Sequence, residues 1–348
     1  MEILDLIRLS IEKNASDLHI TVGLPPIMRI YGKLVPTELE ALTSNDVEQL
    51  VLKMLNEDQR QKLEKARSID FTYSYIGRFR VNVFYEKGYL AAALRFIPFE
   101  IPSLENLEVP PIVAELARKQ RGLVLVTGPT GSGKSTTLAA MIDLINREDS
   151  CHIITVEDPI EYLHPHKKSI VHQREIYADT PSFSLALRDA LREDPDVILV
   201  GEMRDLETIS TAITAAETGH LVFATLHTID AVQTIDRIID VFSEGQQSQI
   251  RLQTSLSLQG VISQRLIPRA DGKGRVAAIE AMSVTPAIAN LIREKKTYQI
   301  YSMIETGTKE GMLSFNQSLA DLCKARLIRI NDALTYSNKP ELLKRMLL

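Results

Sequence analysis

The chain has 348 residues, enough for two domains of ordinary size that each bury a core. A hydrophobic fraction of 45% and a charged fraction of 24% exclude a fibrous or low-complexity chain, and no apolar stretch approaches the roughly 18 residues of a membrane-spanning helix. The net charge of -5 gives no support for a direct nucleic-acid partner, and membrane association is expected only through a partner protein.

Residues 1–97 predict an α+β domain. A stretch with helical spacing of apolar residues is followed by two short strands and two further helical stretches. The last three expected elements are strands that form an antiparallel meander. Thr43 and Asp46 form a capping-box pattern at the start of the second helix. The expected elements cover residues 3–13, 17–22, 27–31, 43–54, 57–65, 69–75, 79–85 and 89–97.

Residues 98–111 contain four prolines and are expected to link this domain to a second one at 112–348. In the second domain short apolar strands alternate with helical patterns, as in a parallel sheet covered on both faces, so the fold class is α/β. Its expected strands lie at 123–127, 152–156, 197–200 and 221–225, and its expected helices at 134–146, 183–191 and 206–217. From residue 231 onward mostly helical structure is expected, with a hairpin at 270–278.

Residues 128–135 match the G-x-x-x-x-G-K-[ST] pattern between a strand and a helix, which favours a phosphate-binding loop over a simple glycine-rich turn. Its glycines let backbone N–H groups point at phosphates, and the helix adds its positive N-terminal end. Lys134 is expected to reach the β and γ phosphates of ATP, and the Ser135 hydroxyl to bind Mg²⁺. The expected nucleotide-binding residues are Gly128, Pro129, Thr130, Gly131, Ser132, Gly133, Lys134, Ser135 and Thr136.

Hydrolysis also needs a carboxylate that positions the attacking water and completes the surroundings of the metal. Glu202 follows the apolar strand at 197–200 and is the candidate for both roles, although Gly201 occupies the usual Walker-B aspartate position. The alternative is an exposed surface glutamate.

A second acidic segment, Glu157-Asp-Pro-Ile-Glu161, follows the strand at 152–156. Glu161 is the expected second polariser of water or Mg²⁺, because the carboxyl end of a parallel strand is where such sheets place ligands. An acidic loop that caps a helix is the alternative.

Two histidines flank the strand at 221–225. His227 and Thr225 are candidates for sensing the γ phosphate, while a structural role is equally open for His220. No spacing with cysteine supports zinc, and the two distant cysteines fit a reducing cytoplasm.

Arg78 and Arg80 lie two residues apart on one expected strand and so share a face, and Arg95 on the next strand could join them. Clustered guanidinium groups suit phosphate oxygens, but a solvated basic face is the other reading. An arginine-finger role across a subunit interface is the functional hypothesis.

Four of these segments together resemble the Walker A, Asp, Walker B and His boxes of the secretion and pilus ATPases. They read GPTGSGKSTT at 128–137, ITVEDPIEY at 154–162, DPDVILVGEMRDLET at 194–208 and GHLVFATLHT at 219–228, in matching order and spacing. Within that superfamily the chain most resembles the type IV pilus retraction ATPases. This similarity extends through nearly all of the chain, including SDLHI at 16–20, GRFRVNVF at 77–84 and NLIREKKTYQI at 290–300.

The resemblance implies a RecA-like P-loop NTPase core, an N-terminal PAS-like α+β domain and a homo-hexameric ring with ATP held between the two domains. It also implies roles for individual residues. Glu202 would be the catalytic glutamate, with Glu161 as its helper and His227 near the γ phosphate. Phosphate contacts would come from the N-terminal domain through Arg78, Arg80 and Arg95.

The function implied by the resemblance is ATP hydrolysis that powers pilin depolymerisation, pilus retraction and twitching motility. The ring would be cytoplasmic and would act on the inner-membrane platform protein at the base of the pilus machine. Pilus-extension and secretion ATPases usually carry an extra N-terminal domain and a four-cysteine zinc insertion that this sequence lacks. An extension or type II secretion ATPase of the same fold remains one alternative, and a RecA-like nucleic-acid motor or regulatory nucleotide-binding module is another.

Overall fold

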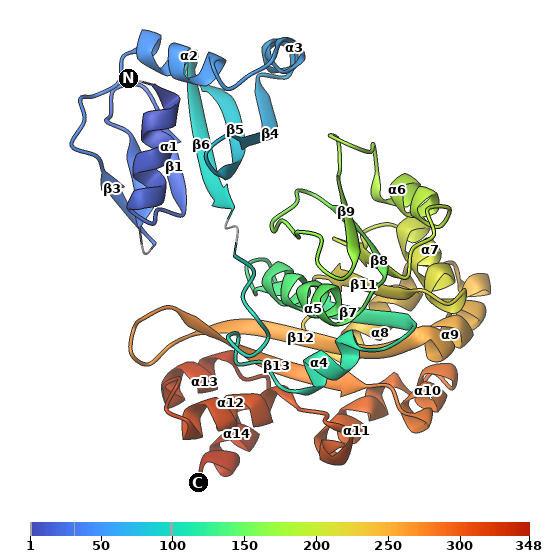
Figure 1. The fold of residues 1–348 in the computed structure, drawn as a ribbon. Helices are drawn as coiled ribbons and strands as arrows, with labels where there is room; N and C mark the ends of the chain where they lie inside the picture. Colours follow the sequence, from blue (N-terminus) through green and yellow to red (C-terminus); the bar gives the residue numbers. More distant parts are fainter. Residues whose placement is uncertain (1, 31, 98–99) are drawn as a thin grey trace. The chain divides into compact units, whose positions relative to one another are not determined.

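A computed structural model describes residues 2–30, 32–97 and 100–348. The chain divides into two compact units, Met1–Glu100 and Ile101–Leu348, and each has its own hydrophobic core (Figure 1). Tyr31, at the end of an expected strand, and Pro98 and Phe99, at the start of the expected linker, lie outside the described residues. Within the described ranges, no helix is long and apolar enough to cross a membrane.

The first unit is an antiparallel sheet in the order β3-β2-β1-β6-β5-β4, with three helices. Its elements are α1 (Ile3–Glu12), β1 (Asp17–Ile20), β2 (Ile27–Ile30), β3 (Lys33–Pro36), α2 (Ser44–Leu52), α3 (Glu57–Ala66), β4 (Ser68–Ser74), β5 (Arg78–Glu86) and β6 (Tyr89–Ile97). The predicted capping box starts α2, because Thr43 Oγ1 accepts from the N–H of Asp46 at 3.2 Å and the Asp46 carboxylate accepts in return at 2.9 Å. The sequence did not predict β3, since all four of its residues are exposed and give no alternation.

The second unit is built on a sheet in the order β13-β12-β7-β11-β10-β8-β9, in which every described pairing is parallel except that of β12 with β13. Its strands are β7 (Gly122–Thr127), β8 (His152–Glu157), β9 (Ile170–Glu175), β10 (Val197–Val200), β11 (Leu221–Leu226), β12 (Leu258–Pro268) and β13 (Arg275–Ser283). Its α-helices are α4 (Ile112–Ala117), α5 (Lys134–Glu148), α6 (Phe183–Ala190), α7 (Leu206–Glu217), α8 (Ala231–Asp240), α9 (Glu244–Ser257), α10 (Pro286–Arg293), α11 (Ile300–Thr306), α12 (Phe315–Lys324), α13 (Ile330–Tyr336) and α14 (Pro340–Leu347).

The central strands bury both of their faces. On β7, Leu123 and Leu125 pack into a core with α7 and α8, whereas Val124 and Val126 pack into a second core with α4 and α5. All six residues of β7 and of β11 are buried. This burial explains why the sequence of each strand is nearly continuous in apolar residues, and it confirms the predicted α/β class.

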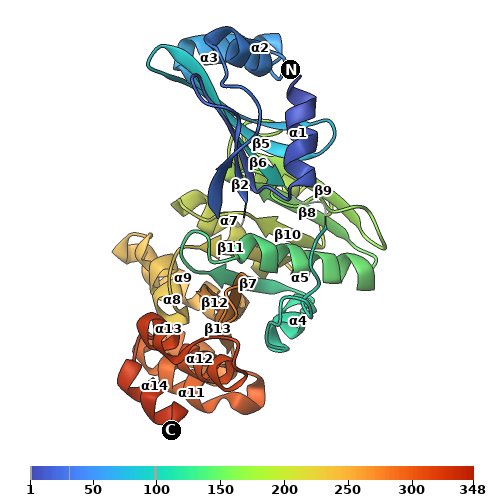
Figure 2. The same cartoon turned by 90° about the vertical axis from the view of Figure 1, so that its left-hand side faces the viewer.

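The region after residue 231 differs from its expectation. The predicted hairpin turn is present, but β12 and β13 flank it as long strands, so mostly helical structure is wrong for residues 258–283. Ser263 and Gln264 interrupt the apolar pattern of β12 and hide it from sequence inspection. The helices α12 and α13 then pack beside this hairpin (Figures 1 and 2).

Gly260 on β12 is a position at which the packing between the sheet and α4 can be tested. A Cβ at Gly260 would lie 2.6 Å from Leu116 Cδ2 and 2.8 Å from the carbonyl oxygen of Met282. Gly260→Ala is therefore expected to lower the free energy of unfolding by about 1–3 kcal/mol through overpacking. Chemical denaturation followed by circular dichroism measures the change.

Gly245→Ala is the matched control, because a Cβ there meets nothing within 4 Å in the first turn of α9. It should raise the free energy of unfolding by about 0.4–1 kcal/mol, because alanine reduces the conformational entropy of the unfolded chain. Equal stability of the two variants would contradict the packing argument.

Candidate active site

Four adjacent parallel strands of the second unit end at one edge of the sheet, and a sequence motif follows each of them. The loop at 128–135 follows β7, His227 follows β11, Glu202 follows β10 by two residues, and the acidic segment follows β8. The backbone register places these strand ends side by side. Because parallel sheets bind ligands at the carboxyl ends of their strands, the four motifs form one candidate site.

The loop after β7 has the conformation that its glycines allow. Gly128, Gly131 and Gly133 have φ angles of 143°, 76° and 89°. A Cβ at Gly128 would lie 2.3 Å from the carbonyl oxygen of Gln264, so the position accepts only glycine. The N–H of Thr137 is the first in α5 to reach a helical acceptor, Gly133 O at 3.0 Å, which leaves the N–H groups of the first turn available to an anion.

Lys134 lies across this loop. Its Nζ donates to the carbonyl oxygens of Gly128 at 2.9 Å and Pro129 at 3.3 Å. Partial burial lowers the pKa of the ammonium group, and the negative charges of Glu202 and Glu161 oppose this shift. The lysine is therefore close enough to both candidate carboxylates to be coupled to them electrostatically.

Gln264 on β12 supports the loop, and the sequence analysis missed it. Its Nε2 donates to the carbonyl oxygen of Ser132 at 2.8 Å, and its Oε1 accepts from Thr137 Oγ1 at 3.0 Å. The residue is 2% exposed. A buried amide with both ends bonded to the loop and the helix fixes their relative position. The available signal was a polar residue inside an otherwise apolar segment.

Glu202 is held by two cationic or potentially cationic side chains. Its Oε1 lies 2.6 Å from Arg204 Nε and 3.1 Å from His227 Nε2, and its Oε2 accepts from Arg204 at 2.7 Å. Partial burial opposes ionisation, but the Arg204 hydrogen bond and the charges of Arg204, His227 and Lys134 outweigh it and hold the pKa of Glu202 below its ordinary value. Arg204 belongs to the motif at 194–208, but no role was predicted for it from the sequence.

Packing accounts for glycine at the usual aspartate position. A Cβ at Gly201 would lie 3.1 Å from the carbonyl oxygen of Val156 on β8, which leaves little room for a side chain. The Thr225 hydroxyl donates to the carbonyl oxygen of Gly201, and the N–H of Met203 donates to Thr225 O at 3.1 Å. Thr225 thus joins the ends of β10 and β11, a structural contact that the sequence analysis did not foresee.

The two histidines have different surroundings. His220 directly precedes β11, at the opposite end of that strand from His227, and its Nδ1 lies 2.9 Å from the carbonyl oxygen of Ala215 in the last turn of α7. That contact supports the structural reading of His220. His227 lies at the other end of the strand, against Glu202.

The acidic segment at 157–161 carries three carboxylates: Glu157, the last residue of β8, is partly exposed, and Asp158 is exposed. Glu157 accepts from Thr155 Oγ1 at 2.6 Å and from Gln173 Nε2 at 3.1 Å, and burial raises its pKa to about 7. Glu161 is exposed. The next element along the chain is the strand β9, so the structure does not support a helix-capping role for this segment.

The three arginines lie on adjacent strands of the first unit. Arg80 is opposite Arg95 in the β5-β6 register, and Arg78 lies two residues before Arg80 on the same face. Arg80 forms a fork-like pair with Asp70, with contacts of 2.9 Å from Nε and 2.6 Å from the terminal nitrogen, and Arg95 Nε lies 3.0 Å from Asp17. The guanidinium groups of Arg80 and Arg95 are therefore held in place by carboxylates of their own unit.

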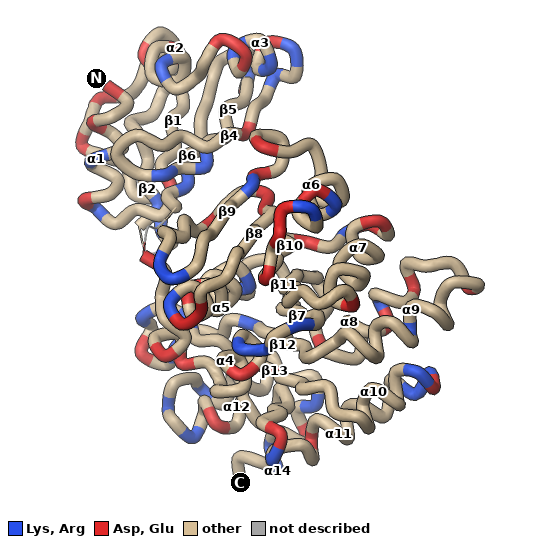
Figure 3. The backbone as a smooth tube through the Cα atoms, turned by 45° about the vertical axis from the view of Figure 1, so that its right-hand side comes forward, with Lys and Arg blue, Asp and Glu red and all other residues tan. Residues whose placement is uncertain are grey.

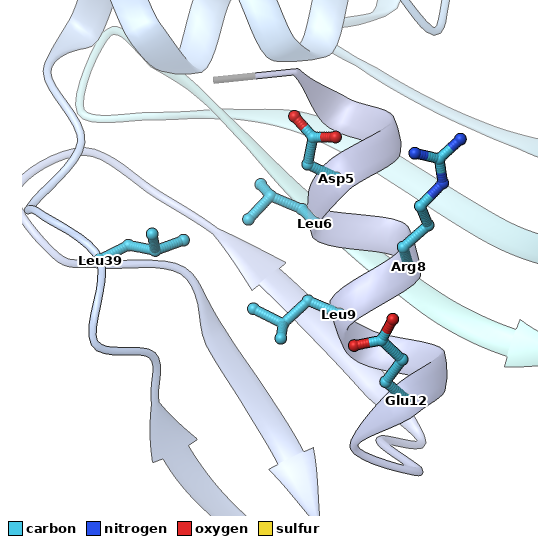
Figure 4. Close-up of a pocket in the computed structure, with 6 residues that line it drawn as sticks. All are labelled: Asp5, Leu6, Arg8, Leu9, Glu12 and Leu39. Carbon is cyan, nitrogen blue, oxygen red and sulfur yellow. The ribbon is translucent and has the colours of Figure 1, made fainter.

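A groove of about 370 Å³ on the first unit lies along α1 and is distinct from this arginine face (Figure 4). It has a leucine-lined floor and a charged rim, formed by Asp5, Leu6, Arg8, Leu9, Glu12 and Leu39. Basic and acidic positions are interspersed over both units (Figure 3).

The residues of the candidate site fit a magnesium ion that a nucleotide brings with it. Among the described residues no three His, Cys, Asp or Glu side chains are grouped closely enough to hold a metal. Ser135 and Glu202 offer oxygen atoms only, which suits Mg²⁺ when phosphate oxygens and waters supply the remaining ligands.

Comparisons with known proteins agree with this geometry. Residues 103–317 match the family model described as Type II/IV secretion system protein. The chain is 49% identical to the type IV pilus retractation ATPase PilT of Pseudomonas aeruginosa, over 98% of this chain and 99% of the relative. It is also 49% identical to a twitching motility protein of Neisseria gonorrhoeae, over 94% and 88% of the two chains. The crystal structure of the pilus retraction motor PilT with bound ADP matches with a TM-score of 0.94 and 52% identity over 99% of both chains.

Two substitutions separate binding from hydrolysis. Lys134→Ala is expected to abolish tight ATP binding, because it removes the charge that faces the β and γ phosphates. Glu202→Gln should keep ATP binding and lower kcat by about 100-fold or more, because the amide is a poor acceptor for the proton of water. Calorimetry and a phosphate-release assay measure the two effects.

Glu207→Gln is the control for a glutamate that lies outside the site, since its carboxylate pairs with Arg188 at 3.3 Å and both side chains are about half exposed. It should change neither quantity. A Glu202→Gln variant that hydrolyses ATP as fast as the parent would remove Glu202 from the mechanism.

Proposed function

Because the chain belongs to the family of type II/IV secretion system proteins, we propose that it is the ATPase that powers type IV pilus retraction and twitching motility. The protein is an ATP hydrolase. The observation that carries this conclusion is the meeting of the phosphate-binding loop, Glu202 and His227 at one sheet edge, in a chain similar over nearly its whole length to a retraction ATPase.

The chemistry follows from the side chains of the site. The first turn of α5 and Lys134 bind the phosphates, and Glu202 accepts a hydrogen bond from the attacking water. The hydrogen bond and charge of Arg204 lower the pKa of Glu202, so its carboxylate is available as an acceptor at neutral pH, and His227 contacts the same oxygen as Arg204 Nε. Glu161 assists from the acidic segment. Bound Mg²⁺ would neutralise charge on the β and γ phosphates, with Ser135 and Glu202 at its ligand shell.

The assembly is a further part of the proposal. Residues 1–97 form a PAS-like domain, 98–111 a linker and 112–348 the RecA-like ATPase, and six copies form a ring. The ring works in the cytoplasm on the inner-membrane platform protein of the pilus machine. The two compact units and the similarity to a pilus motor support this arrangement.

The arginines of the first unit complete the proposed site. We assign Arg78, Arg80 and Arg95 to the phosphates of ATP bound by a neighbouring copy. The common face of the three arginines and the side-chain positions of Arg80 and Arg95, fixed by Asp70 and Asp17, support this role.

Arg80→Ala is expected to lower kcat by about 100-fold or more with little change in ATP affinity, because an arginine finger acts mainly on the transition state. Mixed rings test whether it acts across an interface. Mixing Arg80→Ala copies with Glu202→Gln copies should restore hydrolysis, since some sites then combine an intact Arg80 with an intact Glu202.

Arg67→Ala is the matched control, because Arg67 belongs to the same unit and stacks on the ring of Tyr85 at 3.6 Å. Its kcat should equal that of the parent. If hydrolysis is not restored in the mixed rings, Arg80 acts on the nucleotide that is bound by its own copy.

The cellular role has a direct test in the strain that carries this gene. Deletion should leave abundant surface pili and no twitching, because filaments would be built but not withdrawn. The Lys134→Ala gene should fail to complement the deletion, and the parent gene should succeed. Microscopy and a motility assay give the readout. A cell without pili would instead identify an extension ATPase.

A further inference from the structure

A buried polar cluster lies beside His227, at the beginning of α8. Glu280 on β13 is 4% exposed and Asp230, the N-cap of α8, is 2% exposed. Tyr301 on α11 is half-buried, which raises its pKa, and the negative charges of Asp230 and Glu280 contribute to this rise. Burying two neighbouring carboxylates is costly unless both are bonded, so their contacts are informative.

Both carboxylates bind the N-terminal end of the same helix. Glu280 Oε1 accepts from the N–H of Ala231 at 2.9 Å, and Asp230 Oδ1 accepts from the N–H of Gln233 at 2.8 Å. These N–H groups have no acceptor within the helix, and a negative charge is favourable there. Glu280 therefore connects the first residue of α8 to the sheet through β13.

The start of α8 is also joined to the turn that carries His227. Only Thr228 and Ile229 separate His227 from Asp230. Thr228 Oγ1 lies 2.7 Å from Thr234 Oγ1, and Thr234 in turn donates to the carbonyl oxygen of Asp230 at 2.7 Å. A displacement of the first turn of α8 would therefore move His227 relative to Glu202, which it contacts at 3.1 Å.

We propose that Glu280 is a positioning residue for ATP hydrolysis, which acts by fixing the start of α8 and thereby the placement of His227 against Glu202. The inference rests on the proposed ATPase function. The described hydrogen bond of Glu280 is made with Ala231 at the start of α8 and not with the phosphate-binding loop, so its effect is expected on the chemical step and not on nucleotide binding.

The charge state of Glu280 supplies an independent readout. The groups that act on it are Asp230 before α8, Arg265 on β12 and Lys339 before α14, with Tyr301 facing the same cluster. Burial raises the pKa of Glu280 to about 7, and the contact with Ala231 and the two cations only partly offset this. A raised carboxyl pKa gives stability that is present below the ordinary value of 4.5 and is lost as the pH rises through about 7.

The experiment compares Glu280→Gln, which keeps an acceptor for Ala231, with Glu280→Leu, which removes it. The Leu variant is expected to lower kcat by about 10-fold or more with KM for ATP within about twofold, and the Gln variant to recover most of kcat. The difference between the Tm of the Gln variant and the Tm of the parent should shift in favour of the Gln variant as the pH rises from 4.5 to 7, because only the parent loses the stability linked to Glu280. Glu157 titrates in both proteins and so cancels in the comparison.

Thr228→Val covers the case in which Glu280→Leu does not fold, because it removes the hydroxyl contact with Thr234 and leaves the volume nearly unchanged. It should also lower kcat without raising KM. The inference is overturned if the folded Leu and Val variants keep the parent's kcat, or if Gln is as impaired as Leu. A parent protein that hydrolyses no ATP would refute the proposed function instead.

Discussion

The burial of both faces of the central strands is the constraint on which the candidate site depends. A side chain in the middle of β7, β10 or β11 points into one of two apolar cores, where an unpaired charge would be costly. Charged side chains that could act on a ligand can therefore lie only beyond the ends of these strands. Since parallel strands all end at the same edge, the residues that follow them are brought together although about 100 residues separate Gly128 from His227.

Within this edge the balance of charge decides what Glu202 can do. An isolated carboxylate so close to buried strands would be driven toward its neutral form, which cannot serve as an acceptor for the proton of water. Arg204 and Lys134 supply positive charge from two different segments and reverse this tendency. Glu157 has hydrogen bonds but no cation among the groups that act on it, and its pKa is raised. Two carboxylates at one edge thus have opposite protonation behaviour because their neighbours differ.

Local patterns made part of this structure predictable. The Thr43 capping box, the bounds of α7 and the start of α5 directly after the glycine-rich loop depend on residues near one another in the sequence, and each was found where expected. Contacts between distant residues were not predictable. Gln264 supports a loop 132 residues earlier in the sequence, and nothing in its immediate surroundings indicates that partner. The same holds for β12, because Ser263 and Gln264 have hydrogen-bond partners on β7 and on the loop that follows β7.

The pairing of the arginines adds a physical condition to any role in catalysis. Arg80 and Arg95 are already neutralised by Asp70 and Asp17, so contact with a phosphate requires an exchange of one anion for another. A nucleotide triphosphate offers more negative charge than a single carboxylate and can favour that exchange, whereas water cannot. In the role proposed for these arginines, the two carboxylates would compete with phosphate for them. Such competition would make engagement of the first unit depend on the charge of the nucleotide, and the loss of a phosphate would weaken that engagement without any change in the fold of either unit.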